Sequence, residues 1–483
     1  MSGTKANPYT RPPNLDILYV KNNNTDRAHD LREGFIQFSY YESLLSPYIT
    51  GSLTYLDSGQ GGVVDSQNDT PESTRTGTVI NTLPLVAGED IKVKLNHPSG
   101  VLDFSGDNQH FIVDSFKDYN NGGGERNSIV HLNLISKFGE KNKRTSIPEP
   151  QEGNIRNSLY VILRDKLGVP TSMLSKLENT RNSHNFKTNN RSPFHIAEYL
   201  AVRSMPVQSD SFGGYFFWES QTGFNFRAID SLIRNSPVDN YTESDVSAGA
   251  EKVHASCRIL KSSVIKRSDN SAEKNFGLFK TKHVEFNPYS FDMSEKTFNP
   301  LLEYDFSATL GSNSISAEYL NQAPSISGLS VDDLSSWSYN DSATFSTFTI
   351  LDTGNNDANP SSNVTACGIS TALNNDPSQW KTSSSIRYNL LMSNIVDIVV
   401  PCNLHLKAGQ SIRCHFPKLT SGNKNEGSSD ERISGKYLIL DLSHKFQNES
   451  TFGSLTHMRL VRDTNGLYNA ESSSSDEDNT VDT

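Results

Sequence analysis

Two distant segments of the chain carry the same strand pattern, and this repetition limits the possible folds more than any other feature of the sequence. Residues 85–95 read LVAGEDIKVKL, and residues 406–416 read LKAGQSIRCHF. Each has an Ala-Gly turn followed by a strand in which apolar and polar residues alternate. The identical positions are Ala87 and Ala408, Gly88 and Gly409, and Ile91 and Ile412.

The next two strands correspond in the same order. Residues 111–119 (FIVDSFKDY) align with 438–446 (LILDLSHKF), and residues 128–136 (SIVHLNLIS) align with 454–462 (SLTHMRLVR). The aligned identities are Ile112 with Ile439, Asp114 with Asp441, Ser128 with Ser454, His131 with His457, and Leu134 with Leu460. A one-residue slip would turn every side chain to the opposite face, so the shared alternation matters. Chance similarity between strands is the alternative, but the ordered triple match favours two related β-barrels.

Two helices and a hairpin are expected between these strands. Apolar residues recur at helical spacing in 155–167, followed by Gly168 and Pro170 as stop signals. Ser192 can cap a second helix that begins at Pro193. Residues 213–233 read GGYFFWESQTGFNFRAIDSLI, which predicts two aromatic strands around a turn at Gly223.

We therefore expect a mainly β protein with a small α insert, an α+β chain of two duplicated antiparallel β-barrels plus inserted domains. A chain of 483 residues is too long to fold around a single hydrophobic core. The expected units are an N-terminal arm at 1–14, a first barrel at 15–145, a helical insert at 146–208, a second barrel formed by 209–235 and 386–463, an inserted loop-rich β region at 236–385, and an acidic disordered tail at 464–483.

Composition narrows the function. No apolar run approaches the roughly 18 residues that span a bilayer, and the opening MSGTKANPYTRPP has no apolar leader core, so we expect a soluble chain without a membrane anchor. The formal net charge is −11, and part of it lies in the closing ESSSSDEDNTVDT. The lack of basic patches argues against DNA binding. Four scattered cysteines suit small apolar residues in a reducing compartment: Cys257, Cys367, Cys402 and Cys414.

We expect no catalytic, cofactor-binding or metal site. His131 and His457 fall on polar strand faces, where a surface or interface role is expected. Asp114 and Asp441 belong to separate barrels and lack a shared cleft for acid/base work. Cys402 and Cys414 flank one strand without a histidine partner. The hairpin aromatics have only Arg227 among them, so core or inter-subunit packing is expected rather than base stacking: Phe216, Phe217, Trp218, Phe224 and Phe226.

The second helix and the hairpin after it resemble the central baseplate hub protein of T-even-type contractile-tailed phages. The resemblance covers about 15–235 and 390–463, whereas about 300–385 does not match. The closing strands, ISGKYLILDLSHKF and LTHMRLVRD, also resemble those of hub and type VI spike proteins. The positions that carry the hub pattern are Pro193, Phe194, Phe217, Glu219, Gly223, Phe224, Asn225, Phe226, Arg227, Ile229, Asp230, Ser231 and Leu232.

This resemblance implies a non-enzymatic homotrimer whose six tail-tube-like barrels form a pseudo-six-fold ring between tail tube and central spike. The implied partners are further copies of the chain, the spike protein, the tube protein, and other baseplate or tape-measure proteins, with DNA only passing through the lumen. The implied location is the virion baseplate, assembled in the host cytoplasm, and no cofactor is implied.

Two alternatives remain, one of the same architectural kin and one from a different functional class. A type VI secretion spike hub would be expected to carry a C-terminal spike repeat, but the chain closes with an acidic segment. A β-rich glycan or peptidoglycan hydrolase needs convergent carboxylates or a nucleophile with its base, and the sequence offers no such constellation.

Overall fold

The computed structural model describes residues 7–22, 27–57, 63–65, 79, 83, 85–120, 128–208, 212–243, 254–267, 281–286, 288, 291–298, 309–310, 345–350, 377–417, 430, 433–448 and 452–464. These residues are mainly β with a few helices, as expected. The glycine-rich connection near 122–124 and the acidic tail lie outside them.

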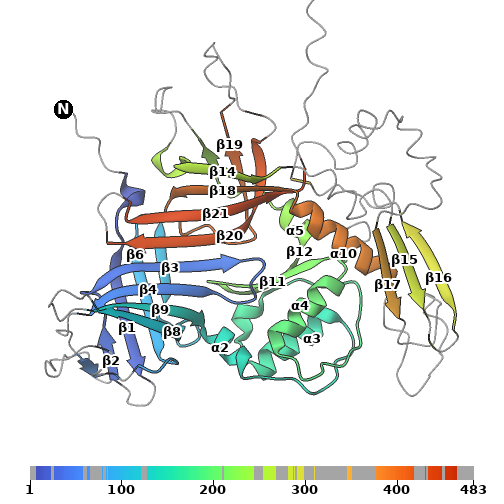
Figure 1. Cartoon of the computed structure of the whole chain (residues 1–483), viewed down its shortest axis with the longest axis horizontal. Coiled ribbons are helices and arrows are strands. Elements are labelled where there is room, and N and C mark those ends of the chain that lie inside the picture. The colour runs from blue at the N-terminus through green and yellow to red at the C-terminus, as the bar shows by residue number, and fades with distance from the viewer. Residues whose placement is uncertain are drawn as a thin grey trace, which may run out of the picture.

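One large, mainly antiparallel sheet runs through both repeated halves (Figure 1). Its path follows β14 (Lys261–Lys266), β18 (Asn394–Pro401), β21 (Ser454–Arg462), β20 (Gly435–Gln447), β3 (Phe35–Ser43), β4 (Thr50–Asp57), β9 (Ser128–Ser136), β8 (Phe111–Asn120), β6 (Asp90–His97), β1 (Asn14–Asn22), β2 (Arg27–Asp30) and β5 (Val63–Asp65). β7 (Gly100–Phe104) pairs with β6, and β19 (Ser411–His415) pairs with β20 and with β13 (Asn240–Thr242).

The expectation of two closed barrels is not met by the described strands. Their pairings form an open path, because β3 uses one edge for β4 and the other for β20. The first half therefore continues into the second half instead of closing on itself. Each half nevertheless surrounds its own apolar cluster, around Leu53 and Leu132 in the first half and around Ile398 and Met458 in the second.

The helical insert and the aromatic hairpin form a third unit. It contains α2 (Lys137–Lys143), α3 (Ile155–Val161) with the turn η2 (Ile162–Lys166), η3 (Thr171–Leu174) and α4 (Pro193–Arg203). β11 (Tyr215–Ser220) and β12 (Gly223–Ala228) make the expected hairpin, and β10 (Lys176–Leu177) extends it to a separate three-stranded sheet. The sequence pattern assigned this hairpin to the second barrel, whereas its described pairs lie outside the large sheet.

Both faces of the hairpin are buried, which explains its unbroken aromatic run. Phe217 and Phe224 pack with the helices of the insert. Phe216 and Trp218 point the other way, into a cluster shared with the second half. The five hairpin aromatics are at most 4% exposed, which confirms core packing, one of the two roles expected for them. The expected Ser192 cap makes no side-chain bond, and Asn142 Oδ1 instead accepts from the Phe194 amide at 2.8 Å.

The later insertion contains a three-stranded sheet of β16 (Met293–Phe298), β15 (Thr281–Phe286) and β17 (Phe345–Ile350). A helix that the sequence did not predict, α10 (Pro377–Leu391), contacts this sheet and α4 (Figure 1). Its small polar residues are buried: Ser384 Oγ donates to the Val202 carbonyl at 2.7 Å, and Ser383 Oγ accepts from the Gly213 amide at 3.2 Å. Among the described residues, no helix is long and apolar enough to cross a membrane.

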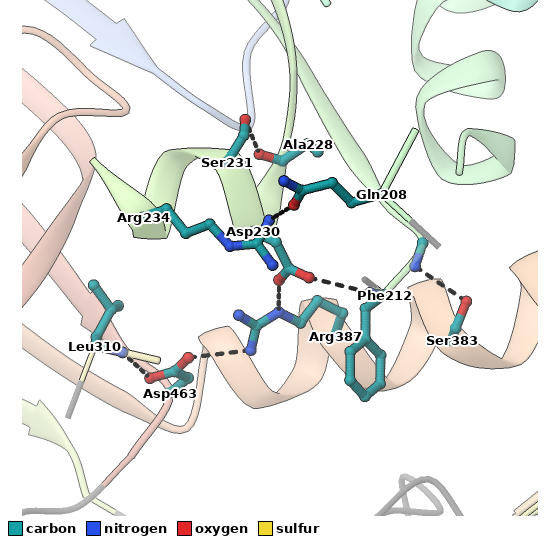
Figure 2. Close-up of polar contacts among 11 residues, drawn as sticks. Gln208, Phe212, Ala228, Asp230, Ser231, Arg234, Leu310, Ser383, Arg387 and Asp463 are labelled. Atoms are coloured by element: carbon teal, nitrogen blue, oxygen red, sulfur yellow. Dashed lines mark hydrogen bonds and ion pairs between the residues drawn. The ribbon is translucent and has the colours of Figure 1, made fainter. Parts of the chain in front are cut away.

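A buried ion cluster holds α10 to the rest of the molecule (Figure 2). Arg387 donates to Asp230 at 2.7 Å and to Asp463 at 3.1 Å, and all three side chains are at most 2% exposed. Asp230 lies on α5 (Ile229–Arg234), directly after the hairpin, and Asp463 follows β21. The remaining carboxylate oxygens accept backbone amides, from Phe212 at 3.1 Å and Leu310 at 3.0 Å.

We expect Arg387→Met to destabilise the protein by about 3–5 kcal/mol, because it leaves two buried carboxylates without their cation. Arg459→Met is the matched control, since the Arg459–Asp397 pair is exposed and its loss should cost less than about 1 kcal/mol. Urea unfolding followed by fluorescence measures both. Losses of similar size in the two variants would contradict the structural importance assigned to the buried cluster.

Candidate functional site: the repeated β-units and the seam between them

The last hairpin of each half has the same register and the same bulge. In β8–β9, Val113 pairs with Leu134 and Ser115 with Asn133, so Asp114 is the extra residue. In β20–β21, Ile439 pairs with Leu460 and Asp441 with Arg459, so Leu440 is the extra residue. Every equivalent pair is separated by 326 positions along the chain. Bulges mark defined positions in a sheet, so this coincidence supports true repetition.

This register shifts the sequence alignment of residues 111–119 with residues 438–446 by one position. Asp441 is equivalent to Ser115, and Asp114 is equivalent to Leu440. The sequence favoured the Asp–Asp match because the extra residue of a bulge is invisible in an alternating pattern. The two carboxylates lie in separate halves: Asp114 Oδ1 is 2.5 Å from Lys143 Nζ, whereas Asp441 Oδ1 accepts from Ser43 Oγ at 2.5 Å.

The Ala-Gly turns before the two units make equivalent hydrogen bonds. The Gly88 amide donates to the Val113 carbonyl at 2.8 Å, and the Gly409 amide donates to the Ile439 carbonyl at 2.9 Å. Glu89 in one turn and Gln410 in the other each accept, through the side chain, the backbone amide three residues earlier, at 2.7 and 2.9 Å. The strands that follow also match in register, with Ile91 opposite Phe111 and Ile412 opposite Tyr437.

Each unit consists of four strands that are neighbours in the sheet, and the strand order is the same in both units. β8–β9–β4–β3 in the first half corresponds to β20–β21–β18–β14 in the second. Leu132 pairs with Leu53, and the equivalent Met458 pairs with Ile398. The duplication that the sequence indicated is therefore present in strand order, direction and register.

The two units meet where β20 pairs with β3, which we call the seam. It contains seven residue pairs, from Asp441 opposite Ser43 to Gln447 opposite Gln37. On its core side the His444 ring stacks on Tyr40 with centroids 5.9 Å apart, and Phe446 stacks on Phe38 at 6.3 Å. The seam thus joins the units by a backbone ladder and by aromatic packing.

Two buried glutamates link the hairpin to the large sheet, and the sequence pattern gave them no role of this kind. Glu42, on β3, accepts from the Gln221 amide at 2.9 Å, the Ala408 amide at 3.0 Å and the Tyr40 hydroxyl. Burial raises the pKa of Glu42 and raises that of Glu219 to about 7.

Glu219 lies on the hairpin itself. It accepts from the Ile49 amide at 3.1 Å and from Ser136 Oγ at 2.5 Å. Both carboxylates contact backbone amides and hydroxyls and are at most 5% exposed, so they act as structural links. Their signal in the sequence was a single acid within an aromatic strand, in YYES and FWES.

The open face of the sheet carries polar, apolar and charged side chains where the two units meet. A shallow groove on this face crosses the seam from β14 to β4. Arg459 in the groove pairs with Asp397 at 3.0 Å and with Asp441 at 3.7 Å, which largely neutralises the charge there. Other lining residues include Tyr41, Ser43, Thr50, Lys261, Ser263, Ser443 and His457.

Other residues weighed in the sequence are not brought together. His131 accepts or donates one bond with Thr54 at 2.9 Å, and His457 is exposed in the other unit. Cys402 lies in the core of the first half and Cys414 in that of the second, where burial raises both thiol pKa values, that of Cys402 to about 12. Within the described ranges no cluster of three His, Cys, Asp or Glu could hold a metal ion.

No protein-family model matches the chain, and no curated protein matches it in sequence. Solved structures to which the chain is similar include a tail protein from Neisseria meningitidis MC58, with 9% identity, 93% of this chain and 97% of that chain covered, and a TM-score of 0.47. The 43 kDa tail protein of prophage MuSo2 from Shewanella oneidensis shares 8% identity, with 92% and 98% covered and a TM-score of 0.45. An E. coli type VI secretion component, described as similar to the T4 tail proteins gp27 and gp5, shares 9% identity, with 92% and 76% covered and a TM-score of 0.38.

We expect Gly409→Ala to destabilise the protein more than Gly88→Ala. Both glycines have positive φ, 83° and 101°, so both substitutions cost about 1 kcal/mol in backbone strain. A Cβ at Gly409 would lie 2.7 Å from Trp218 Cζ2, whereas nothing lies within 4 Å of a Cβ at Gly88. Overpacking should add about 1–3 kcal/mol at Gly409 alone. Equal shifts in the urea midpoint of the two variants would contradict this expectation. They would mean that the Trp218 ring moves away from the added Cβ at no cost in stability.

The seam should weaken on acidification through His444. Burial lowers the pKa of His444 to about 4, below its ordinary 6.5, so the folded state prefers the neutral ring. The contribution of His444 to the free energy of unfolding is fully present above pH 6.5. It is lost as the pH falls towards 4, because in that range only the unfolded chain takes up the proton. The loss is about 3 kcal/mol at most.

The matched variant is His444→Gln, which removes the titration. The difference in unfolding free energy between wild type and variant should be constant above pH 6.5 and shift by up to about 3 kcal/mol towards the variant at pH 4. This difference isolates His444 from Glu219, whose raised pKa acts in the opposite direction. A difference that stays constant from pH 7 to pH 4 would contradict the assignment.

Proposed function

We propose that this chain is a non-enzymatic structural subunit of a phage tail baseplate. In this proposal three copies form a ring of six similar β-units, which joins the tail tube to the central spike and leaves a channel for DNA. The observation that carries it is the repetition of one four-stranded unit, with matching bulge and turn hydrogen bonds, within a single chain.

The repetition supports a ring because identical contacts can then recur around an axis. A chain with two equivalent units can occupy two neighbouring places of a six-fold arrangement, so three chains complete it. The seam already supplies one such contact inside each chain. This is also how a three-fold assembly can match a six-fold tube.

The dimensions suit a channel. The two units contribute eight adjacent strands per chain. Three chains would align 24 strands, and a spacing of about 4.8 Å between strands gives a perimeter of about 115 Å and a width of about 37 Å between backbones. The core clusters cover the other face of each unit, so the open face is the side available to line the channel.

The charge on that face suits passage rather than retention of DNA. Arg459 is matched by two carboxylates, and Lys261 is the other basic residue among those that line the groove. Strong binding of DNA needs several phosphate contacts from Lys or Arg, and their affinity would hold the genome in the channel. A wall with few unmatched cations avoids this.

The inserted parts are placed to meet other tail proteins. The sheet of β15, β16 and β17 lies at the far end of the molecule from β1 and β2 (Figure 1). Large apolar side chains are exposed in this sheet and just before β16, including Phe291 at 80%, Met293 at 63% and Ile350 at 60%. Exposed apolar patches on soluble proteins mark interaction sites. We assign this region to contacts with spike or neighbouring baseplate proteins in the virion.

The test is the mass and shape of the purified chain. We expect light scattering after size exclusion to give three times the chain mass of 53.5 kDa, and three-fold-averaged electron micrographs to show six similar lobes around a channel. Binding of DNA should remain weak at about 150 mM salt. A monomer at every concentration tested, or a two-fold dimer, would contradict the proposal.

A further inference from the structure

We infer that neighbouring copies of this chain join by antiparallel pairing of β8 with β14, in the register of the seam. The inference rests on the proposed ring and names the strands that close it. It follows from the repeat: β20 is equivalent to β8, and β3 is equivalent to β14. The pair β20–β3 exists within the chain, so its equivalent is β8 of one copy with β14 of the next.

The β8 edge is open where the equivalent edge of β20 is occupied. β20 pairs with β19 near its start and with β3 from Asp441 to Gln447. β8 pairs with β6 only at Phe111 and Ile112 on that side. Beyond this point no described strand pairs with that edge of β8. The first unit therefore lacks the neighbour that the second unit has.

The β14 edge is open in the same way. Among the described strands β14 pairs with β18 alone, through four of its residues before a register shift and Lys266 after it. Val264 is 43% exposed, whereas Tyr40, its equivalent at the seam, is 2% exposed. Ile265 is 55% exposed beside it. An open strand edge with exposed apolar side chains is a ready template for another strand.

The equivalence also gives the register between copies. Lys445 opposite Ser39 at the seam corresponds to Tyr119 opposite Ser263. His444 opposite Tyr40 corresponds to Asp118 opposite Val264. This pairing would cover Val264 and Tyr119, which is 59% exposed in the single chain.

The two edges differ in net charge. The β8 segment carries Asp114 and Asp118 against Lys117, whereas β14 carries Lys261 and Lys266 and no acid. In the inferred register Lys266 lies opposite Lys117, as Tyr41 lies opposite Ser443 at the seam. The contact joins different surfaces of the two copies, so it is head-to-tail and closes into a ring when the rotation allows it.

The test is a disulfide between copies of the full-length chain. The double variant Tyr119→Cys/Ser263→Cys places two thiols at directly opposed positions, whose Cα atoms would lie about 5 Å apart. After mild oxidation we expect a ladder of covalent dimers and trimers on a non-reducing gel, lost on reduction. Equimolar mixtures of the two single variants should give covalent dimers only.

The matched control is Ile129→Cys/Ser263→Cys. Ile129 pairs with Tyr119 and lies one strand further from the edge. Its Cα would be about 10 Å from the partner's Ser263, beyond the reach of a disulfide. The wild-type chain shows how much crosslinking comes from the native cysteines. The variant Ser39→Cys/Lys445→Cys tests disulfide formation at the seam, where the bond stays within one chain.

The outcomes separate this inference from the proposed function. Trimers that form no Tyr119–Ser263 bond, or that bond equally in the Ile129 control, overturn the pairing and leave the trimeric hub intact. Covalent ladders that run past three copies support the pairing and overturn the trimer. A chain that stays monomeric overturns both.

A charge on the inferred interface provides a second test. Val264→Lys would bury a cation at the joint, so we expect the concentration for half-assembly to rise at least about tenfold. Val161→Lys is the control, because Val161 on α3 is 42% exposed, against 43% for Val264. Each variant's thermal midpoint checks that the single chain remains folded. Unchanged assembly of a folded Val264→Lys protein overturns the inference.

Discussion

Backbone pairing across the seam is the contact on which the rest of the structure depends. The ladder between β20 and β3 turns two separate units into one sheet, and it prevents the first half from closing on itself. It joins residues about 400 positions apart in the chain. Within the insertion, β15, β16 and β17 form a separate sheet, whereas β13 and β14 join the large sheet.

Buried polar groups determine how the other parts sit on this sheet. Glu42 and Glu219 link the aromatic hairpin to the large sheet, and Arg387 links α10 to α5 and to the end of β21. Apolar packing alone would allow such elements to slide over each other. A buried carboxylate that accepts two or three specific hydrogens is satisfied in one arrangement only, since a buried unpaired charge is costly.

Different parts of the structure were predictable to different degrees. The strands, the two main helices and the hairpin with its turn at Gly223 follow from alternation, helical spacing and turn residues. α10 does not, because Thr382, Ser383, Ser384 and Arg387 share its buried face with Ile386, Leu390 and Leu391 and interrupt the apolar pattern. The Asp114–Asp441 match failed because a bulge changes the register of a strand without changing its apolar pattern.

The sequence by itself determined that one strand unit occurs twice, because local alternation and an Ala-Gly turn are properties of short segments. Only the tertiary structure decided that the units share a sheet and which edges remain open. Hydrogen bonds between strand edges form between backbone atoms that every residue possesses. The choice of partner for β3 and β20 therefore leaves almost no trace in side-chain pattern, and it depends on how both units pack in space.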